Sequence, residues 1–250
     1  MRTIRLGFLG MGVVGSGTLY ALELQQEELE KRLGCKFELA KVAVLSIAEH
    51  KGHPLPLEVM TEDVWEVVRD PSIDIIIELM GGSNPARDCI LEALAGGKMV
   101  VSANKEVVAQ HGDIIFEQVE KTGAGFFFEA SVCGAIPIVR ALKQSYAADR
   151  ILELVGIVNG TCNFILTEMD QQGQSFEVAL NVARELGYAE ADPTNDIEGY
   201  DAQRKLAILA DLAFASRVKL SEVFVEGLKG IEPVDLAYAR EFGYAIKLLA

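Results

Sequence analysis

The sequence predicts an α/β protein with a doubly wound, mainly parallel sheet, followed by a second domain of the α+β class. One observation and one rule of sheet topology support the first part. Short apolar runs alternate with helical patterns through the first 130 residues, and helical crossovers of this length join parallel strands. One observation supports the second part: after residue 150 the alternation stops, and helices follow one another directly. We therefore expect two domains, 1–130 and 131–250.

Strands and helices of the first domain are assigned from apolar density, capping residues and helix stops. Strands are expected at 4–9, 37–46, 73–79, 99–102 and 126–129, and helices at 14–32, 61–69, 85–95 and 105–121. In the second domain we expect strands at 151–158 and 223–228, helices at 161–172, 175–186, 200–215 and 235–242, and a final apolar run at 244–250. This run stops without a turn or polar tail, so we expect the natural chain to continue.

Composition excludes several classes of protein. The 250 residues carry a net charge of −14, and half of them are hydrophobic. An acidic chain is poorly suited to nucleic acid or anionic membranes, because phosphates are neutralised by clustered Lys and Arg. The sequence has neither a continuous apolar stretch of transmembrane length nor an N-terminal signal, and its four cysteines are widely separated. We expect a cytoplasmic protein with reduced thiols.

A glycine-rich turn follows the first strand directly. The segment Gly10-Met11-Gly12-Val13-Val14-Gly15 has the spacing G-x-G-x-x-G, between a strand and a helix. Gly10 permits the tight turn, Gly12 leaves room for a diphosphate, and Gly15 lets the helix approach the strand. Strand, turn and helix in this order predict a Rossmann-type domain that binds a dinucleotide, with its phosphates at the helix N-terminus. The alternative to dinucleotide binding is that these glycines serve only to let the helix pack closely on the strand.

The choice between NAD and NADP stays open at this stage. It is commonly made by an acidic or basic residue at the end of the second strand. Residues 45–48 supply neither, and Glu49 and Lys51 come slightly later.

Several further segments resemble the homoserine dehydrogenase family, and the resemblance runs from about residue 4 to the C-terminus. They are Gly7–Gly17, Glu78–Gly82, Val101–Lys105, Gly156–Asn163, Gly187–Pro193 and Asp196–Lys205. The end of the second strand is the main departure. The resemblance implies a nicotinamide-dependent oxidoreductase that interconverts aspartate 4-semialdehyde and L-homoserine, in the biosynthesis of threonine, methionine and isoleucine.

The resemblance also implies the roles of individual residues. Lys205 would donate the proton to the carbonyl oxygen, with Asp201 orienting it and contacting substrate. Spacing alone allows a second interpretation without a catalytic role. Asp201 and Lys205 lie at positions i and i+4 of one predicted helix, where they can form a surface ion pair. Glu190 would bind the substrate's α-ammonium group, although by composition its loop is a solvated acidic one. Lys105 would lie near cofactor and substrate as a fixed positive charge. The alternative for Lys105 is a solvent-exposed lysine at the start of a helix. Asn104, the residue before it, can cap that helix.

Further positions follow from the same resemblance. Gly81 and Gly187 would lie near the cofactor. A monovalent cation, usually sodium, would be held by Glu129 and by the carbonyls of Val132, Gly134 and Ile136, since hard cations prefer oxygen ligands. A homodimer formed through the second domain is implied as well.

Two other functions remain open. The chain could be another two-domain NAD(P)-dependent dehydrogenase, acting on a different amino-acid-derived aldehyde or keto acid. It could also be a dinucleotide-binding sensor without turnover.

Overall fold

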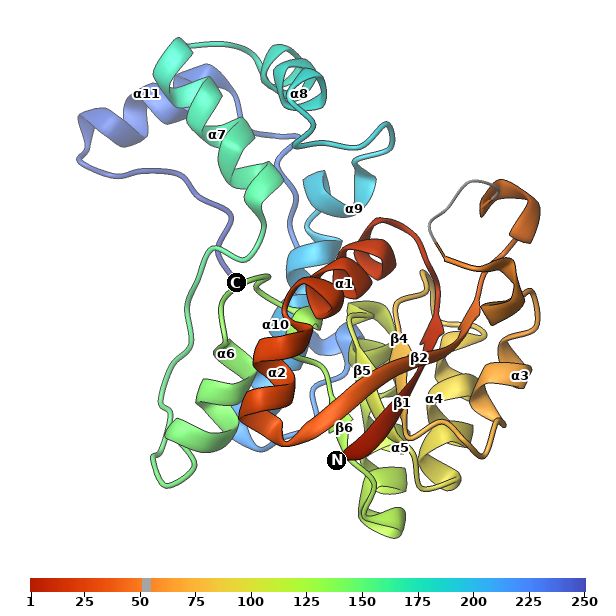
Figure 1. Cartoon of the computed structure of the whole chain (residues 1–250). Helices are drawn as coiled ribbons and strands as arrows, with labels where there is room; N and C mark the ends of the chain where they lie inside the picture. The colour runs from red at the N-terminus through yellow and green to blue at the C-terminus, as the bar shows by residue number, and fades with distance from the viewer. Residues whose placement is uncertain (51–54) are drawn as a thin grey trace. The chain divides into compact units, whose positions relative to one another are not determined.

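The computed structural model describes residues 1–50 and 55–250 and divides the chain into two compact units, Met1–Ala135 and Ile136–Ala250 (Figure 1). Lys51 lies outside the described residues, so its part in the choice of cofactor stays a prediction. No helix of the described part of the chain is both long and apolar enough to cross a bilayer.

The first unit is built on a six-stranded parallel sheet with the strand order β3-β2-β1-β4-β5-β6. Its strands are β1 Arg2–Leu9, β2 Cys35–Ala43, β3 Met60–Thr61, β4 Ile75–Glu78, β5 Met99–Ser102 and β6 Phe126–Phe127. Its helices are α1 Val13–Leu24, α2 Gln26–Leu33, α3 Val64–Val68, α4 Ala86–Ala95 and α5 Lys105–Thr122. Figure 1 shows α1 and α2 on one face of the sheet and α3, α4 and α5 on the other. The predicted doubly wound Rossmann fold is confirmed.

The order in which strands are added to the sheet changes direction between β1 and β4, which lie side by side although two strands separate them in sequence. In open parallel sheets, ligands bind at such a point, outside the carboxyl ends of the strands. The core beneath it is made of fully buried apolar residues on both faces of the sheet, including Phe8, Ile76, Ile90, Leu94, Val100 and Ile115.

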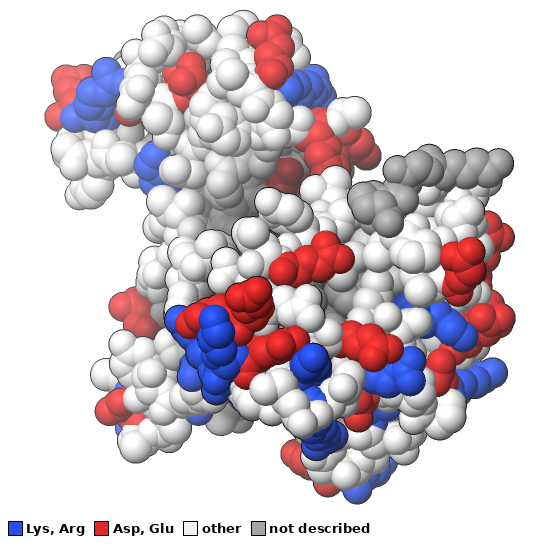
Figure 2. Space-filling model, viewed as in Figure 1, with Lys and Arg blue, Asp and Glu red and all other residues white. Residues whose placement is uncertain are grey.

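The predicted helix 14–32 is in fact two helices. Gln25 leaves the helical conformation, with φ −102° and ψ 9°, and α2 begins at the next residue. α1 buries Gly15 and Leu19, whereas α2 buries none of its residues and carries ion pairs between Lys31 and Glu27 and between Arg32 and Glu28. Figure 2 shows basic side chains (Lys and Arg, blue) interspersed with acidic ones (Asp and Glu, red) on the visible face.

The second unit is mainly helical. Its helices are α6 Ile138–Arg140, α7 Gly160–Gln172, α8 Phe176–Glu185, α9 Thr194–Ile197, α10 Tyr200–Phe214 and α11 Pro233–Glu241. Its core is formed by buried residues of α7 and α8 together with Ala189, Ile197, Leu228 and Leu236.

The two strands expected in the second unit are not formed, and that part of the prediction is wrong. Residues 151–158 and 223–228 are irregular, as is the final run 244–250. A strand needs a neighbour along its length. Among the residues that the structure describes, backbone pairing of the first run is limited to Gly156 and Ala250, which exchange two hydrogen bonds of 2.9 Å. The run 223–228 instead places Leu228 in the helical core, where the Leu228 N–H donates to the Ile197 carbonyl.

Candidate functional site

The glycine turn has the geometry that its spacing predicts. Gly10 has φ +98°, and a side chain there would meet the Leu79 carbonyl oxygen at 2.8 Å. A Cβ on Gly15 would lie 2.4 Å from the Gly10 carbonyl oxygen, so only glycine fits between the helix and the turn. A Cβ on Gly12, by contrast, would meet nothing within 4 Å. The three glycines therefore make the turn, leave open space above it, and let α1 approach closely.

The open space lies in front of a helix N-terminus. α1 begins at Val13, directly after Gly12, with neither a side-chain cap nor an acidic residue in its first turn. Val13 and Val14 are exposed, whereas Met11 is buried. The unpaired N–H groups of a first helical turn and the helix dipole together attract a phosphate group. Gly10 to Gly15 can thus hold a dinucleotide's diphosphate.

Three loops meet at this edge of the sheet because the strands are parallel and in register. Leu9 pairs with Glu78, and Glu78 pairs with Ser102. The glycine turn after β1, the loop after β4 that contains Gly81, and the turn after β5 that leads to Lys105 therefore begin at the same level. Gly81 is exposed, and Lys105 is partly buried at the first position of α5.

A buried carboxylate organises two of these loops. Glu78 is fully buried, and its Oε2 accepts a hydrogen bond of 2.5 Å from the Ser102 hydroxyl. Its Oε1 accepts from the Met80 N–H at 2.9 Å and, more weakly, from the Asn104 amide at 3.4 Å. The same Asn104 amide donates to the carbonyls of Gly82 at 2.8 Å and Met80 at 3.2 Å.

Burial raises the pKa of Glu78, and the hydrogen bonds from Ser102, Met80 and Asn104 oppose this shift. The resemblance implied no separate role for Glu78. One signal for it was present in the sequence: a single carboxylate ends the otherwise apolar strand 75–78. A buried acid in such a position needs several donors, which the adjoining loops supply.

The second unit contains an oriented lysine. Lys205 and Asp201 lie one turn apart on α10, and the Lys205 Nζ is 2.6 Å from Asp201 Oδ2. The Lys205 Nζ also donates to the Val158 carbonyl at 2.8 Å. The side chain of Asp201 is 3% exposed and that of Lys205 is 18% exposed. The pair is therefore not the surface ion pair that spacing alone allows, and the lysine keeps limited access to solvent.

Asn159 lies beneath this ion pair and was not predicted as a site residue. Its amide donates to Asp201 Oδ2 at 2.8 Å and to Asp196 Oδ1 at 2.7 Å, and its Oδ1 accepts from the Cys162 N–H at 2.8 Å. Asp196 thus belongs to a hydrogen-bonded network, whereas its acidic loop suggested a solvated side chain.

The loop that carries Gly187 and Glu190 is attached to α7. Gly187 has φ +78° just after α8, as expected for a glycine that ends a helix. The Tyr188 carbonyl accepts a hydrogen bond of 2.7 Å from the Thr161 hydroxyl, and the Tyr188 ring stacks on Phe164. Glu190 is exposed on this loop. The start of α7 therefore anchors both this loop and, through Asn159, the Asp201–Lys205 pair.

The segment expected to hold a cation has unusual backbone geometry. Cys133 and Ala135 both have positive φ, 48° and 66°, which non-glycine residues rarely adopt. Val132 is buried, Gly134 is exposed, and the Ile136 carbonyl accepts a hydrogen bond from the Ile138 N–H. Among the described residues, no three His, Cys, Asp or Glu side chains form a metal-binding cluster, so an ion at this segment would depend mainly on backbone carbonyls.

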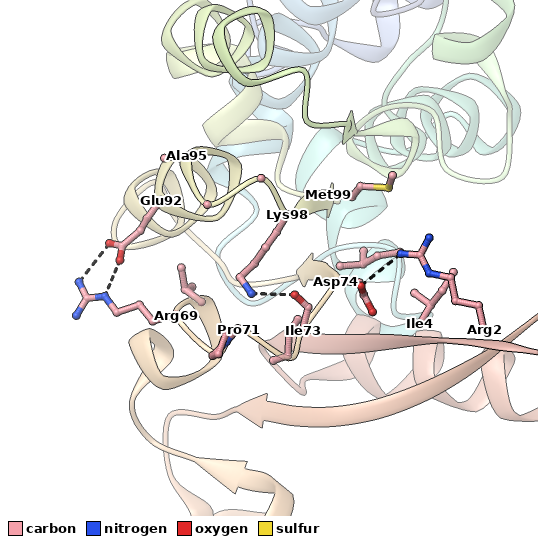
Figure 3. A pocket seen from close by; sticks show the side chains of 14 residues that line it. Arg2, Ile4, Arg69, Pro71, Ile73, Asp74, Glu92, Ala95, Lys98 and Met99 are labelled. Atoms are coloured by element: carbon pink, nitrogen blue, oxygen red, sulfur yellow. Dashed lines mark hydrogen bonds and ion pairs between the residues drawn. The ribbon is translucent and has the colours of Figure 1, made fainter.

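A cavity of about 680 Å³ lies at the opposite, amino-terminal edge of the sheet (Figure 3). Its charged groups already have partners: Arg69 with Glu92, Arg2 with Asp74, and the Lys98 Nζ with the carbonyls of Asp70 and Ile73. Burial lowers the pKa of Lys98. This edge is stabilised by its own side chains, and none of the predicted site residues lies there.

The fold, the glycine turn and the loops at the carboxyl edge define the first unit as a Rossmann-type dinucleotide-binding domain. Two family models match the chain. The model "Homoserine dehydrogenase, NAD binding domain" matches residues 10–129, and the model "Homoserine dehydrogenase" matches residues 137–250. The chain belongs to the homoserine dehydrogenase family.

Individual relatives agree with this assignment. A homoserine dehydrogenase from Synechocystis is 46% identical over 99% of this chain, which covers 57% of that protein. The crystal structure of a homoserine dehydrogenase from Thiobacillus denitrificans is 44% identical with a TM-score of 0.94, over 99% of this chain and 57% of that one. A putative homoserine dehydrogenase from Archaeoglobus fulgidus is 34% identical with a TM-score of 0.89, over 99% of this chain and 79% of that one. The chain thus spans a little over half the length of the first two relatives.

The buried Glu78 predicts a particular dependence of stability on pH. Because its pKa is raised in the folded state, the folded protein holds this proton more tightly than the unfolded chain. The resulting stabilisation is fully present below the ordinary carboxyl pKa of 4.5 and is lost as the pH rises through the raised value. The free energy of unfolding of Glu78→Gln relative to wild type should therefore increase with pH above 4.5, as measured by urea unfolding of both proteins across the pH range.

Glu58→Gln serves as the matched control, because it removes an exposed carboxyl of the same unit. The dependence on pH measured for Glu78→Gln should exceed that measured for this control. A Glu78→Gln difference that depends on pH no more than that of the control would contradict the account of Glu78.

Proposed function

We propose that the chain catalyses the NAD(P)-dependent interconversion of aspartate 4-semialdehyde and L-homoserine. The observation that carries this proposal is the orientation of Lys205, whose Nζ is held 2.6 Å from Asp201 and 2.8 Å from the Val158 carbonyl. A lysine fixed in this way can deliver a proton to one defined position, which general acid catalysis requires. Family membership supports the proposed class of substrate.

The reaction needs one hydride and one proton. A nicotinamide dinucleotide held at Gly10–Gly15 would supply hydride to the carbonyl carbon in the direction of reduction, and in its oxidised form would accept hydride from the hydroxyl-bearing carbon of homoserine. In the direction of reduction, the Lys205 ammonium donates its proton to the carbonyl oxygen, which becomes the hydroxyl of homoserine. Asp201 holds the Lys205 Nζ in place and balances its charge, and in the reverse direction the neutral amine takes the proton back.

Substrate charges have partners of opposite sign. We assign the α-ammonium group to Glu190, an exposed carboxylate on a loop anchored at Tyr188. In addition to holding Lys205, Asp201 contacts the substrate. Lys105, at the start of α5, supplies a fixed positive charge near cofactor and substrate and is a second candidate proton carrier. Gly81 and Gly187 would contact the cofactor, and either NAD or NADP fits the glycine turn.

We place the reaction in the biosynthesis of threonine, methionine and isoleucine and in the cytoplasm. The four cysteines are free thiols, and three of them are buried, which agrees with a reducing compartment. A thiol titration of unreduced protein from the native host that finds fewer than four thiols would contradict this location.

We further propose a homodimer formed through the second unit. Leu152, Val155 and Ile157 are 80%, 63% and 47% exposed on the irregular run 151–158. Extended apolar segments that lack a neighbouring strand tend to pair with another chain. Light scattering coupled to gel filtration would give twice the chain mass for wild type, and a monomer at all concentrations would contradict the dimer.

Replacing Lys205 tests the central role in this mechanism. Lys205→Ala removes the proton donor, so kcat for homoserine oxidation should fall by about 10²- to 10⁴-fold, the usual contribution of a general acid or base. The Kd for NAD or NADP should change less than twofold, because the glycine turn is intact. Stopped-flow or steady-state absorbance of the reduced cofactor gives the rates, and fluorescence titration gives the Kd.

The matched control is Lys219→Ala, which removes an exposed lysine of the same unit. Turnover of Lys205→Ala equal to that of this control would rule out the proposed mechanism. If the wild-type chain binds cofactor without oxidising homoserine, the sensor function gains support. Faster turnover with another small aldehyde or keto acid would favour the second dehydrogenase alternative.

We also propose that a monovalent cation, usually sodium, is held by Glu129 and by the carbonyls of Val132, Gly134 and Ile136. The positive φ angles of Cys133 and Ala135, on either side of Gly134, support the proposal, because they take the backbone out of the extended conformation of a regular strand. In NaCl, the melting temperature should be higher than in choline chloride of equal ionic strength, since a ligand bound only by the folded state stabilises it.

Glu129→Gln should reduce this sodium-dependent difference in melting temperature, whereas Glu153→Gln, an exposed acid of the second unit, should leave it unchanged. Equal melting temperatures of the wild type in the two salts would contradict the cation site.

A further inference from the structure

The two units contain the same local arrangement around an asparagine that caps a helix. Asn104 caps α5 through a hydrogen bond of 3.1 Å from the Val107 N–H to its Oδ1. Asn159 caps α7 through the corresponding bond of 2.8 Å from the Cys162 N–H. Both side chains are buried, and each directs its amide NH₂ at the buried carboxylate of its own unit, Glu78 or Asp201.

In the second unit, the Asn159 amide lies between two carboxylates. One N–H donates to Asp196 Oδ1 and the other to Asp201 Oδ2, the same oxygen that pairs with the Lys205 Nζ. Two neighbouring carboxylates repel each other, and a neutral donor between them satisfies both without adding charge. Asn159 therefore fixes the position of the Asp201 oxygen that holds Lys205.

In the first unit, the Asn104 amide connects two loops. It donates to the carbonyls of Gly82 and Met80 in the loop after β4, while its own backbone N–H donates to the Ser102 hydroxyl at 3.0 Å. This holds the turn that precedes Lys105 against the loop that contains Gly81. Both loops lie at the edge of the sheet where the dinucleotide is expected.

Capping alone does not require asparagine at either position. Serine and aspartate cap helices about as well, because a cap needs only an oxygen acceptor. The side-chain NH₂ group is what asparagine adds, and in both units it is fully used.

We propose that Asn104 and Asn159 are positioning residues for the reaction. Asn159 orients Asp201 against Lys205, and Asn104 fixes the turn that carries Lys105 and the loop that contains Gly81. The proposal rests on the proposed function for its catalytic consequence, whereas the orientation of Lys205 can be tested without turnover.

Serine variants separate positioning from capping, because serine keeps the cap oxygen and removes the NH₂ group. Asn159→Ser should lower kcat at least tenfold and leave the cofactor Kd within twofold, since misplaced catalytic groups lose rate steeply. Asn104→Ser should raise the cofactor Kd about tenfold. Asp63→Ser is the matched control. Asp63 caps α3 by accepting a hydrogen bond from the Trp65 N–H, and it belongs to neither of the two asparagine networks.

A second readout follows the lysine directly. The ¹⁵N signal of the Lys205 ammonium, assigned by its absence in Lys205→Ala, should shift or broaden in Asn159→Ser and stay unchanged in Asp63→Ser. Circular dichroism of each variant checks that its helices are retained. Asn159→Asp provides an additional variant that caps α7 but places a third carboxylate in the cluster, and it should disturb the Lys205 signal more than serine does.

These outcomes distinguish the inference from the proposed function. If wild type shows no turnover, the proposed function fails for this chain, and the Lys205 signal alone decides the role of Asn159. An unmoved Lys205 signal in Asn159→Ser overturns that role, whether or not kcat falls. For Asn104, a cofactor Kd within twofold of wild type in the serine variant overturns the proposal.

Discussion

The buried carboxylates are the constraint on which both units depend. A carboxylate removed from water is costly unless donors surround it at fixed positions. Glu78 receives its donors from Ser102, the Met80 N–H and Asn104, and Asp201 receives its donors from Asn159 and Lys205. Satisfying each carboxylate thus fixes loops and side chains that are far apart in the sequence.

This requirement connects structural stability with the proposed function. In the first unit, the donors to Glu78 lie in the loops at the carboxyl edge of the sheet, beside the open glycine turn. In the second unit, one donor to Asp201 is Lys205 itself. The groups that satisfy the buried charge are therefore the same groups that would place the cofactor and the reacting proton. The cost of burying the charge is offset by donors that also serve the site.

The sequence predicted the first unit well because local and long-range signals agree there. Strand 99–102 and the glycine turn are formed as predicted, and the cap at Asn104 was among the expected alternatives. The break at Gln25 was missed because 13–33 is helical in pattern throughout. The runs 151–158 and 223–228 have the composition of strands but lack strand neighbours, and strand formation depends on a partner that composition does not specify.

The site was predicted in part. The ion pair between Asp201 and Lys205 follows from i,i+4 spacing, but its burial does not. The link from Asn159 to Asp196 and Asp201 joins residues 37 and 42 positions apart, and spacing gives no signal for it. The most direct test of the account follows the hydride itself: the chain is incubated with aspartate 4-semialdehyde and NADH or NADPH in which both hydrogens at C4 of the dihydronicotinamide are replaced by deuterium. The account predicts homoserine one mass unit heavier, with deuterium at C4, and deuterium-free homoserine or no homoserine with either cofactor would contradict it.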